Sequence, residues 1–414
     1  MSKFENAKYG AANFEADTMQ LPSIFPREMG PNCGKYVQEV IDSGLTVDMV
    51  SRFETAFASA MGVKHCIATP GCTNALHVLA ASLEFEPGSE IIVSPIADYG
   101  TVMGLIRENF IPVFCDTEPS SPNVTANTIK SCISEKTKAI IVVHKLGIPC
   151  EMAPIAELAE KNNLLLIEDA CQAVFAEYNG KLAGTFGHLA AYSFDSEKSM
   201  GGDLGGCVTT NDDVWGDRLR YIGQSRGAKG VPGFGRTHFD KGLALRMPQC
   251  TAAVCLGQLE IIKKQVRNRD KMARLLTAKL KKLDGIIPLL IPDSCTMFSC
   301  WMYGFTVIPE KFKCSPFELA EIIKEKGLGN SGMGKYYLMP DALVFLKNNA
   351  ANKVYPYSLP DAPGEIIYNS EKQTPNAKAF LDTFIRWAWT EKYTEKHVNI
   401  MFNMIKEAVE ENLV

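Results

Sequence analysis

Seven short apolar segments alternate with helical patterns between Val63 and Asn211, and this alternation limits the fold more than any other feature of the chain. The segments are predicted strands at residues 65–69, 91–95, 111–115, 138–144, 164–169, 190–194 and 206–209. Between them lie helical patterns with apolar residues at i, i+3, i+4 and i+7, as in Leu76, Leu79, Ala80 and Leu83. Strands separated by helices indicate an α/β fold with a largely parallel sheet, whose ligands gather at the carboxyl ends of the strands.

The rest of the chain divides into an N-terminal arm and a smaller C-terminal part. Residues 1–35 contain Pro, Gly and Asn without periodicity, which predicts an irregular arm that packs on another part of the molecule. A long helical segment at about 248–283 follows the sheet, and the pattern changes after a turn at residues 284–285. A last helix is predicted from one apolar stripe, which consists of Val398, Met401, Phe402, Ile405 and Val409. We therefore expect a large domain at 1–270, arm included, and a smaller α+β domain at 271–414.

Composition argues against several classes of function. The formal charge of −4 gives no reason to expect nucleic acid or an anionic membrane as a partner. No apolar run reaches the roughly 18–20 residues of a spanning helix, and residues 1–8 lack the apolar core of a secretory signal, so we expect a cytoplasmic protein. The 13 cysteines include no Cys-x-x-Cys pair and are expected to be free thiols, mostly buried, and not metal ligands.

Two residues in the segment 164–211 suggest the chemistry. Asp169 ends an apolar strand, where a carboxylate needs a hydrogen-bonding or cationic partner; taken alone, it could equally be the N-cap of a helix. Lys198 follows an aromatic strand, and although most lone loop lysines are solvated, a desolvated amine here should have a lowered pKa. Glycines, which let the backbone pass close to a ligand, follow it at Gly201, Gly202, Gly205 and Gly206. An acid and a later lysine suit a pyridine cofactor, because the acid can keep the ring nitrogen protonated and the amine can form an imine with an aldehyde.

Other candidate residues flank this pair. The segment Thr69–Leu76 contains a strand end, a tight turn and a helix start, so its amides and the Thr73 hydroxyl could hold a phosphate; the plainer alternative is that Thr73 is a helix N-cap. Gln172 could donate a hydrogen bond to the cofactor's phenolic oxygen. Tyr99 follows the next strand, and its ring could stack on a flat cofactor.

These pieces, in this order, resemble the fold type I pyridoxal-phosphate enzymes, and in particular the DegT/DnrJ/StrS sugar aminotransferases. The resemblance extends from about Gly34 to the C-terminus. Its most specific parts are Glu168–Gln172, Gly180–Gly187, Ser193–Lys198, Gly205–Asn211 and Ala252–Leu259. It implies that the large domain binds pyridoxal 5′-phosphate.

The resemblance also implies a role for each matching residue. Lys198 would form the imine with the cofactor and Asp169 would pair with the ring nitrogen, so these two are the expected catalytic residues. Gln172 would contact the ring oxygen, and Tyr99 the ring face. The phosphate would be held by the turn at Cys72, where the family usually has Gly, together with Thr73 and Ser193.

The family's usual reaction and assembly are further expectations. The resemblance implies transfer of an amino group from an amino acid, with glutamate as first choice, to a keto or aldehydo sugar, in a homodimer with shared active sites. Ala244 stands where the family commonly has an Asn that reaches the partner's phosphate. The Ser193–Lys198 loop and Trp389-Thr390 look most like the transaminases that aminate an eight-carbon acid sugar, the 8-amino-3,8-dideoxyoctulosonate transaminases.

Two alternatives stay open on the same fold, a sugar dehydratase and a non-catalytic regulator. Dehydratases that resemble this group have His at the lysine position, so Lys198 argues against that class. The sequence does not identify the acceptor, whose specificity we expect to lie in the loops at 34–47, 227–237 and 329–338.

Overall fold

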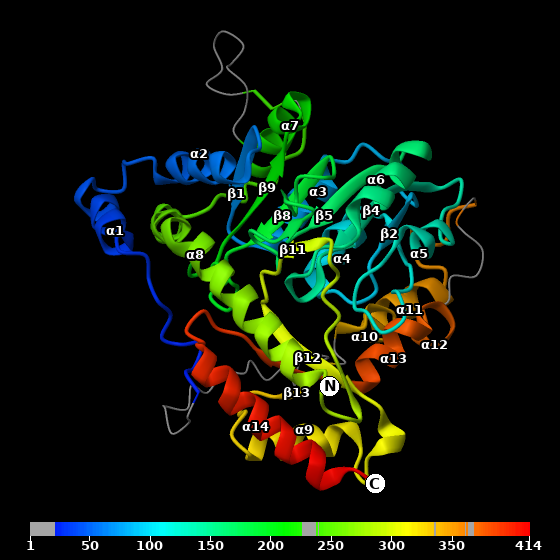
Figure 1. Ribbon diagram of the computed structural model, residues 1–414. Coiled ribbons are helices and arrows are strands. Elements are labelled where there is room, and N and C mark those ends of the chain that lie inside the picture. Colours follow the sequence, from blue (N-terminus) through cyan, green and yellow to red (C-terminus); the bar gives the residue numbers. More distant parts are fainter. Residues whose placement is uncertain (1–20, 226–236, 239, 335–336, 361, 363–367) are drawn as a thin grey trace, which may run out of the picture.

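The computed structural model describes residues 21–225, 237–238, 240–334, 337–360, 362 and 368–414 (Figure 1). Its largest element is a seven-stranded sheet in the order β1-β9-β8-β5-β4-β2-β3. The strands are β1 (His65–Thr69), β2 (Glu90–Val93), β3 (Ile111–Phe114), β4 (Thr137–Val143), β5 (Leu165–Asp169), β8 (Leu189–Ser193) and β9 (Gly206–Thr210). All neighbours pair in parallel except β9, which is antiparallel to β1 and to β8. The predicted α/β fold with a mainly parallel sheet is confirmed.

Alternate residues of each strand pack on opposite faces of the sheet, as strand geometry requires. Ile91 and Val93 pack on one face with α3 (Cys72–Ser82), α4 (Tyr99–Arg107) and α7 (Asp213–Gln224). Ile92 packs on the other face with α5 (Ala126–Lys130) and α6 (Met152–Lys161). The β1-β9-β8 end of that second face is covered by α2 (Met49–Met61) and by the first part of α8 (Gln249–Leu280), while α1 (Cys33–Asp42) precedes α2.

The C-terminal part contains an antiparallel sheet in the order β10-β12-β14-β13. Its strands are β10 (Ile286–Pro288), β12 (Met302–Val307), β13 (Gly332–Met333) and β14 (Phe384–Ala388). The helices α9 (Pro316–Glu325) and α14 (Glu395–Asn412) pack with it, and the last helix buries most of the stripe predicted for it. A third small sheet joins β6 (Glu177–Tyr178) to β7 (Lys181–Leu182) and β11 (Cys295–Met297). The remaining helical elements are η1 (Lys145–Gly147), η2 (Pro309–Lys311), α10 (Met339–Ala342), α11 (Val344–Ala351), α12 (Ser370–Gln373) and α13 (Pro375–Thr383).

Helix α8 connects the two parts, and Figure 1 shows it running from the large sheet toward the small one. Ile262 and Val266 of α8 belong to the core of the large sheet, whereas Met272 and Leu276 belong to the C-terminal core. The chain later returns, because Met339 at the start of α10 packs with the large sheet again. The predicted boundary at residue 270 lies where α8 passes from the core of the large sheet to the C-terminal core, and it stays a prediction. It does not describe the later return of the chain to the large sheet.

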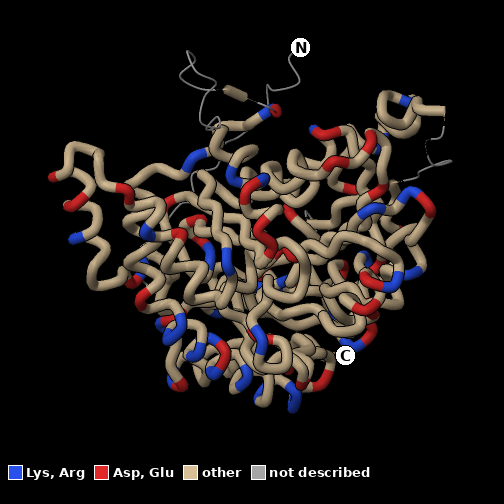
Figure 2. The backbone as a smooth tube through the Cα atoms, turned by 90° about the horizontal axis from the view of Figure 1, so that it is seen from above, with Lys and Arg blue, Asp and Glu red and all other residues tan. Residues whose placement is uncertain are grey.

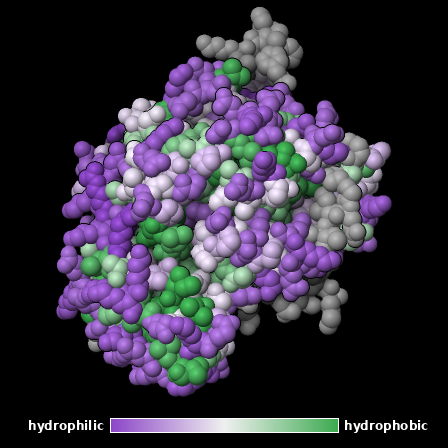
Figure 3. Space-filling view, turned by 45° about the vertical axis from the view of Figure 1, so that its right-hand side comes forward, coloured by the Kyte–Doolittle hydropathy of each residue, from purple (hydrophilic) through white to green (hydrophobic). Residues whose placement is uncertain are grey.

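Charge and hydropathy show no single dominant face in the views drawn. Acidic and basic residues are mixed around the molecule in Figure 2 and do not separate by sign. The face in Figure 3 is mostly hydrophilic but carries several apolar patches. Among the described residues, no helix combines the length and the apolar character needed to cross a membrane.

Candidate active site

A cavity of about 400 Å³ lies at the carboxyl ends of β5 and β8, next to the N-terminus of α3. Six of the seven predicted site residues line it: Cys72, Thr73, Asp169, Gln172, Ser193 and Lys198. Tyr99 does not line it. Its ring is 43% exposed and makes an edge-on contact with Phe345, with ring centroids 6.1 Å apart. The structure thus brings together the acid, the amine and the predicted phosphate turn, and leaves the predicted ring-face residue outside the cavity wall.

Asp169 is a buried and oriented carboxylate. Its side chain is 1% exposed, accepts a hydrogen bond from Thr101 Oγ1 at 2.7 Å and accepts another from the Cys171 amide at 3.1 Å. No helix begins in the segment 170–205, so the N-cap alternative does not apply. Within the described residues no Lys, Arg or His forms an ion pair with Asp169, and a carboxylate in this position suits a protonated ring nitrogen in the cavity.

The neighbouring acid, Glu168, has a different role. Adjacent residues of a strand lie on opposite faces, and Glu168 accepts hydrogen bonds from the amides of Gly184, Phe186 and Gly187 and contacts His144 Nε2 at 2.9 Å. The Cys150 amide donates to His144 Nδ1, so Nε2 carries the proton toward Glu168. Glu168 is therefore satisfied away from the cavity and holds loop 184–187 in place.

Lys198 lies in the loop after β8, with its Nζ 4.0 Å from the centroid of the Trp301 ring. The prediction of a lowered pKa for this amine is wrong. Burial alone would lower the pKa, but nearby acidic groups outweigh burial and raise it above the ordinary 10.5. These groups are Cys171, Cys72, Asp169 and Asp195.

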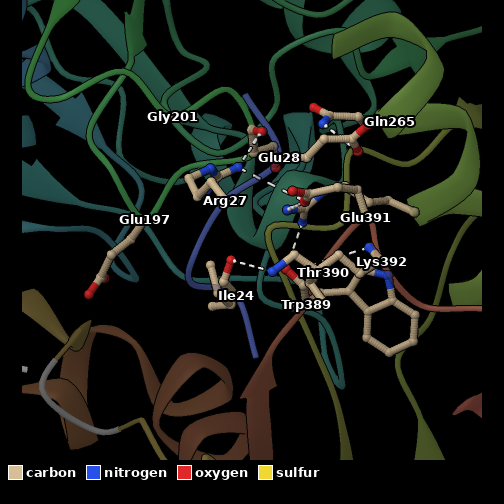
Figure 4. Close-up of polar contacts among 12 residues, drawn as sticks. Ile24, Arg27, Glu28, Glu197, Gly201, Gln265, Trp389, Thr390, Glu391 and Lys392 are labelled. Carbon is tan, nitrogen blue, oxygen red and sulfur yellow. Dashed lines mark hydrogen bonds and ion pairs between the residues drawn. The ribbon is translucent and has the colours of Figure 1, made fainter. Parts of the chain in front are cut away.

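Arg27, from the N-terminal arm, holds the loop that carries Lys198, and Figure 4 shows its guanidinium turned toward Glu391. Its Nη1 donates to the Ser196 carbonyl and its Nη2 to the Ser199 carbonyl, each at 2.9 Å. On its other side Arg27 faces the buried carboxylate of Glu391, which Arg269 also contacts at 2.7 Å. The arm thus fixes the backbone on both sides of Lys198, a contact that the sequence did not reveal.

The N-terminus of α3 is open toward the cavity. Gly71 is the N-cap residue and no side chain caps the helix, so the alternative of Thr73 as N-cap does not apply. The amides of the first turn are therefore free for an anion, and Thr73 and Ser193 add hydroxyls on the same cavity. Gly206 makes this turn possible, because a Cβ there would lie 2.5 Å from the Cys72 nitrogen.

Gln172 is buried at 3% exposure, and its Oε1 accepts a hydrogen bond from the Leu146 amide at 2.7 Å. This bond leaves the side-chain NH₂ as the end that can donate into the cavity.

Cys72 and Cys171 form a pair of thiols on the cavity wall. Together with Asp169 they offer three ligand atoms within 4.8 Å of one another. The pKa of the Cys72 thiol is raised well above its ordinary value, first by the Cys171 thiol and then by burial. None of the 13 cysteines is in a disulfide.

These features fit one cofactor type. An uncapped helix N-terminus beside two hydroxyls suits a phosphate, a buried carboxylate with no ion-pair partner among the described residues suits a pyridine nitrogen, and a lysine in the same cavity suits an aldehyde. Fold and site together define the class of pyridoxal phosphate-dependent enzymes of fold type I.

Comparison with known proteins narrows this class. Residues 28–358 match the model of the DegT/DnrJ/EryC1/StrS aminotransferase family. GDP-perosamine synthase from Caulobacter vibrioides is 36% identical over 273 residues, which cover 65% of this chain and 72% of that protein. The aminotransferase from Psychrobacter cryohalolentis is similar in structure, with a TM-score of 0.80 and 25% identity over 93% of this chain and 98% of that one.

A third relative shows the range of the fold. A GDP-4-keto-6-deoxymannose-3-dehydratase, solved with a trapped PLP-glutamate geminal diamine, has a TM-score of 0.75 at 21% identity, covering 90% of this chain and 97% of that one. The present chain belongs to the DegT/DnrJ/EryC1/StrS aminotransferase family and is a pyridoxal phosphate-dependent sugar aminotransferase.

Proposed function

We propose that this protein moves an amino group from an amino acid, with glutamate as the first candidate donor, to a keto or aldehydo sugar. The observation that carries the proposal is that Asp169 and Lys198 line one cavity beside the free N-terminus of α3. The likeness to a protein named GDP-perosamine synthase supports a sugar as the acceptor.

Each residue contributes one physical effect. Bound pyridoxal phosphate supplies an aldehyde that takes up an amine and a ring that accepts electrons. Asp169, fixed by Thr101 and the Cys171 amide, keeps the proton on the ring nitrogen. Lys198 carries a proton to and from the reacting carbon, which is worth roughly 10²–10⁴ in rate for a positioned acid–base group.

Binding residues surround this pair. The turn amides at Cys72, the Thr73 hydroxyl and the Ser193 hydroxyl hold the phosphate, and the Gln172 amide donates to the ring oxygen. A role for Tyr99 at the ring face stays a prediction, which would require its ring to leave Phe345.

Borohydride reduction followed by peptide mapping tests the central assignment. We expect the reduced cofactor adduct on Lys198, and Lys198→Ala should bind the cofactor without the visible absorbance of the lysine-linked form. An adduct on a different lysine, or normal turnover by Lys198→Ala, would contradict the assignment.

Glutamate followed by a keto-sugar separates the transaminase from its two alternatives. A transaminase converts its cofactor to pyridoxamine phosphate and releases 2-oxoglutarate without an acceptor. A non-catalytic regulator would leave the cofactor unchanged, and a dehydratase would consume a keto-sugar without retaining the amine in the product. A panel of nucleotide-linked keto-sugars and free acid sugars of the eight-carbon type then identifies the acceptor.

The proposed assembly is a homodimer with shared active sites, in the cytoplasm. Exposed apolar side chains near the cavity support a covering partner: Leu204, which lines the cavity, is 53% exposed, and Phe345, beside Tyr99, is 40% exposed. Ala244 is exposed with a φ of 53°, a conformation that Asn adopts more readily than Ala, and it leaves no side chain to reach a partner's phosphate. Light scattering of the purified protein measures the oligomeric state, and a monomer that retains full turnover would contradict shared sites.

A further inference from the structure

A second lysine, Lys145, lies at the same edge of the sheet as the proposed catalytic pair. Strand β4 ends at Val143, which pairs with Asp169 on β5, and the next residue, His144, donates its amide to the Asp169 carbonyl. Lys145 follows directly, at the start of η1. Because parallel strands present ligands at their carboxyl ends, Lys145 occupies a ligand-binding position of the fold.

The backbone that carries Lys145 is held in an unusual conformation. The following residue, Leu146, has a φ of 62°, in the left-handed region that non-glycine residues avoid. The Asn123 side chain accepts from the Lys145 amide at 3.0 Å and Gln172 accepts from the Leu146 amide at 2.7 Å. Two side-chain acceptors therefore fix this turn, and one of them, Gln172, belongs to the cavity wall. Strained backbone that is held in place in this way is concentrated at functional sites.

The amine of Lys145 is buried without a partner. The residue is 3% exposed, and its Nζ has no hydrogen-bond acceptor and no carboxylate partner within the described residues. Its contact is the face of the Tyr337 ring, whose centroid lies 3.9 Å from Nζ. A buried cation normally has an anion, so an unpaired one suggests that the anion comes from outside the protein.

The groups that act on this amine all belong to the cavity. Burial lowers the pKa of Lys145 to about 7, with further effects from neighbouring charges. Those neighbours are Cys171, Lys198, Asp98 and Asp169, and each of them lines the cavity. Lys145 is therefore close enough to the cavity for a charge placed there to act on it.

A second cation shares this wall. Arg386 on β14 lies with its guanidinium carbon 5.8 Å from the centroid of the Tyr337 ring, and its Nε is buried without a partner among the described residues. Lys145, Arg386 and Tyr337 line one small void of about 10 Å³, and Tyr337 also lines the cavity. Tyr337 thus forms the wall between the cavity and the two cations.

We propose that Lys145, backed by Arg386, is a positioning residue whose charge attracts a substrate carboxylate to the Tyr337 wall of this active site, acting across the ring and not by direct contact. The proposal rests on the proposed transaminase function and deepens it, because either substrate can supply the carboxylate. The amino donor carries an α-carboxylate, and an acid-sugar acceptor carries its own. In both cases the reacting carbon stays on the Lys198 side of the cavity.

Equilibrium binding to the holoenzyme tests the proposal without turnover. Succinate is titrated against succinamide, its neutral isostere, by calorimetry with wild type, Lys145→Met, Lys145→Arg and Lys181→Met. Lys181 is the matched control, since its Nζ also lies over an aromatic ring, Phe186, at 4.4 Å, but outside the cavity. Methionine keeps the length of the stem and removes the charge, and arginine keeps the charge.

We expect Lys145→Met to weaken succinate binding about tenfold, less than the loss seen when one partner of a buried hydrogen-bonded charge pair is removed, with succinamide unchanged. Lys145→Arg should restore most of the affinity, and Lys181→Met should match wild type. Arg386→Met should weaken succinate binding less, and it provides a second variant if Lys145→Met is unstable. Less than a twofold change for succinate in both Lys145→Met and Arg386→Met would overturn the proposal.

Two further arms distinguish the sources of the carboxylate. The half-reaction with glutamate measures the donor, and binding of D-glucuronate against D-glucose to the pyridoxamine phosphate form measures an acid acceptor. An effect of Lys145→Met on either arm supports the proposal and names the source. A wild-type protein that no amino acid converts would refute the transaminase function, while the succinate titration would still decide the role of Lys145.

Discussion

Replacing Arg27 by Ala should destabilise the protein and loosen the loop that carries Lys198. The Arg27 side chain is only 5% exposed, and it donates two hydrogen bonds of 2.9 Å to the carbonyls of Ser196 and Ser199. Hydrogen bonds from a charged donor are worth about 1.5–3 kcal/mol each. The ion pair of Arg27 with Glu391 contributes less to the free energy of unfolding, because Glu391 still pairs with Arg269 at 2.7 Å when Arg27 is replaced. We expect a loss of about 3–5 kcal/mol, the range for breaking a buried pair.

Arg52→Ala is the matched control for this variant. Arg52 pairs with Glu39 at 2.6 Å, a shorter distance than the 4.0 Å of Arg27–Glu391, but both side chains are about 40% exposed. Exposed pairs contribute about 0–1 kcal/mol, so Arg52→Ala should be nearly neutral. Urea unfolding of wild type and the two variants measures the difference. A loss below about 1 kcal/mol for Arg27→Ala, or an equal loss in both variants, would refute the reasoning, since burial would then not decide the strength of the contact.

The same variant has a pH signature through Glu391. Burial raises the pKa of this carboxyl, but Arg269 and Arg27 outweigh burial and lower it below 4.5. A lowered folded-state pKa contributes stability above the unfolded pKa of about 4.5, and the contribution is lost as pH falls through the folded value. Removing Arg27 raises the folded pKa, so the acid unfolding transition of Arg27→Ala should move to higher pH. The Arg52→Ala protein should show no such shift.

Three further predictions concern the cofactor site. Asp169→Asn should keep the fold, because its Oδ1 still accepts from the Cys171 amide and its NH₂ can donate to the Thr101 hydroxyl oxygen, but should lower kcat by roughly 10²-fold or more, as measured by steady-state kinetics. Gly206→Ala should weaken pyridoxal phosphate binding, since its Cβ would lie 2.5 Å from the Cys72 nitrogen; fluorescence titration measures the Kd, and an unchanged value would contradict the close approach. Iodoacetamide should modify Cys72 slowly at neutral pH and faster as pH rises, because its pKa is raised, and bound cofactor should protect it; mass spectrometry should find the buried Cys207 unmodified.

The fold was predictable because its signals are local. Buried parallel strands are short apolar runs, and each predicted run from 65–69 to 206–209 is a strand whose ends differ by no more than one or two residues. The direction of β9 was not predictable. Gly206–Thr210 is buried along its whole length like β8, and a buried run carries no information about whether the next strand is parallel or antiparallel. The mixed sheet is therefore seen only in the structure.

The site was predictable where a short motif fixes the geometry. Asp169 ends β5 and Ser193 ends β8, so their positions follow once the strands are known. Tyr99 shows the limit of such reasoning. Asp98 and Gly100 on either side of it line the cavity, but Tyr99 begins α4, and successive side chains on a helix point about 100° apart. The position of Tyr99 between two cavity residues in the sequence therefore did not put its ring into the cavity wall.

Lys145, Arg27 and Trp301 could not be found from the sequence, because each acquires its meaning from a contact far along the chain. Trp301 meets Lys198 across about 100 residues, and Arg27 meets Ser196 across 169. Lys145 is the hardest of the three to find, because what marks it in the structure is that its Nζ has no hydrogen-bond partner among the described residues. Desolvating the Lys145 amine has a cost, seen in its pKa of about 7, and a left-handed Leu146 costs about 1–2 kcal/mol more, against a net stability of only about 5–15 kcal/mol for a typical domain. A methionine would fill the same space without the first cost, so packing alone does not account for an amine at this position, whereas an arriving carboxylate does.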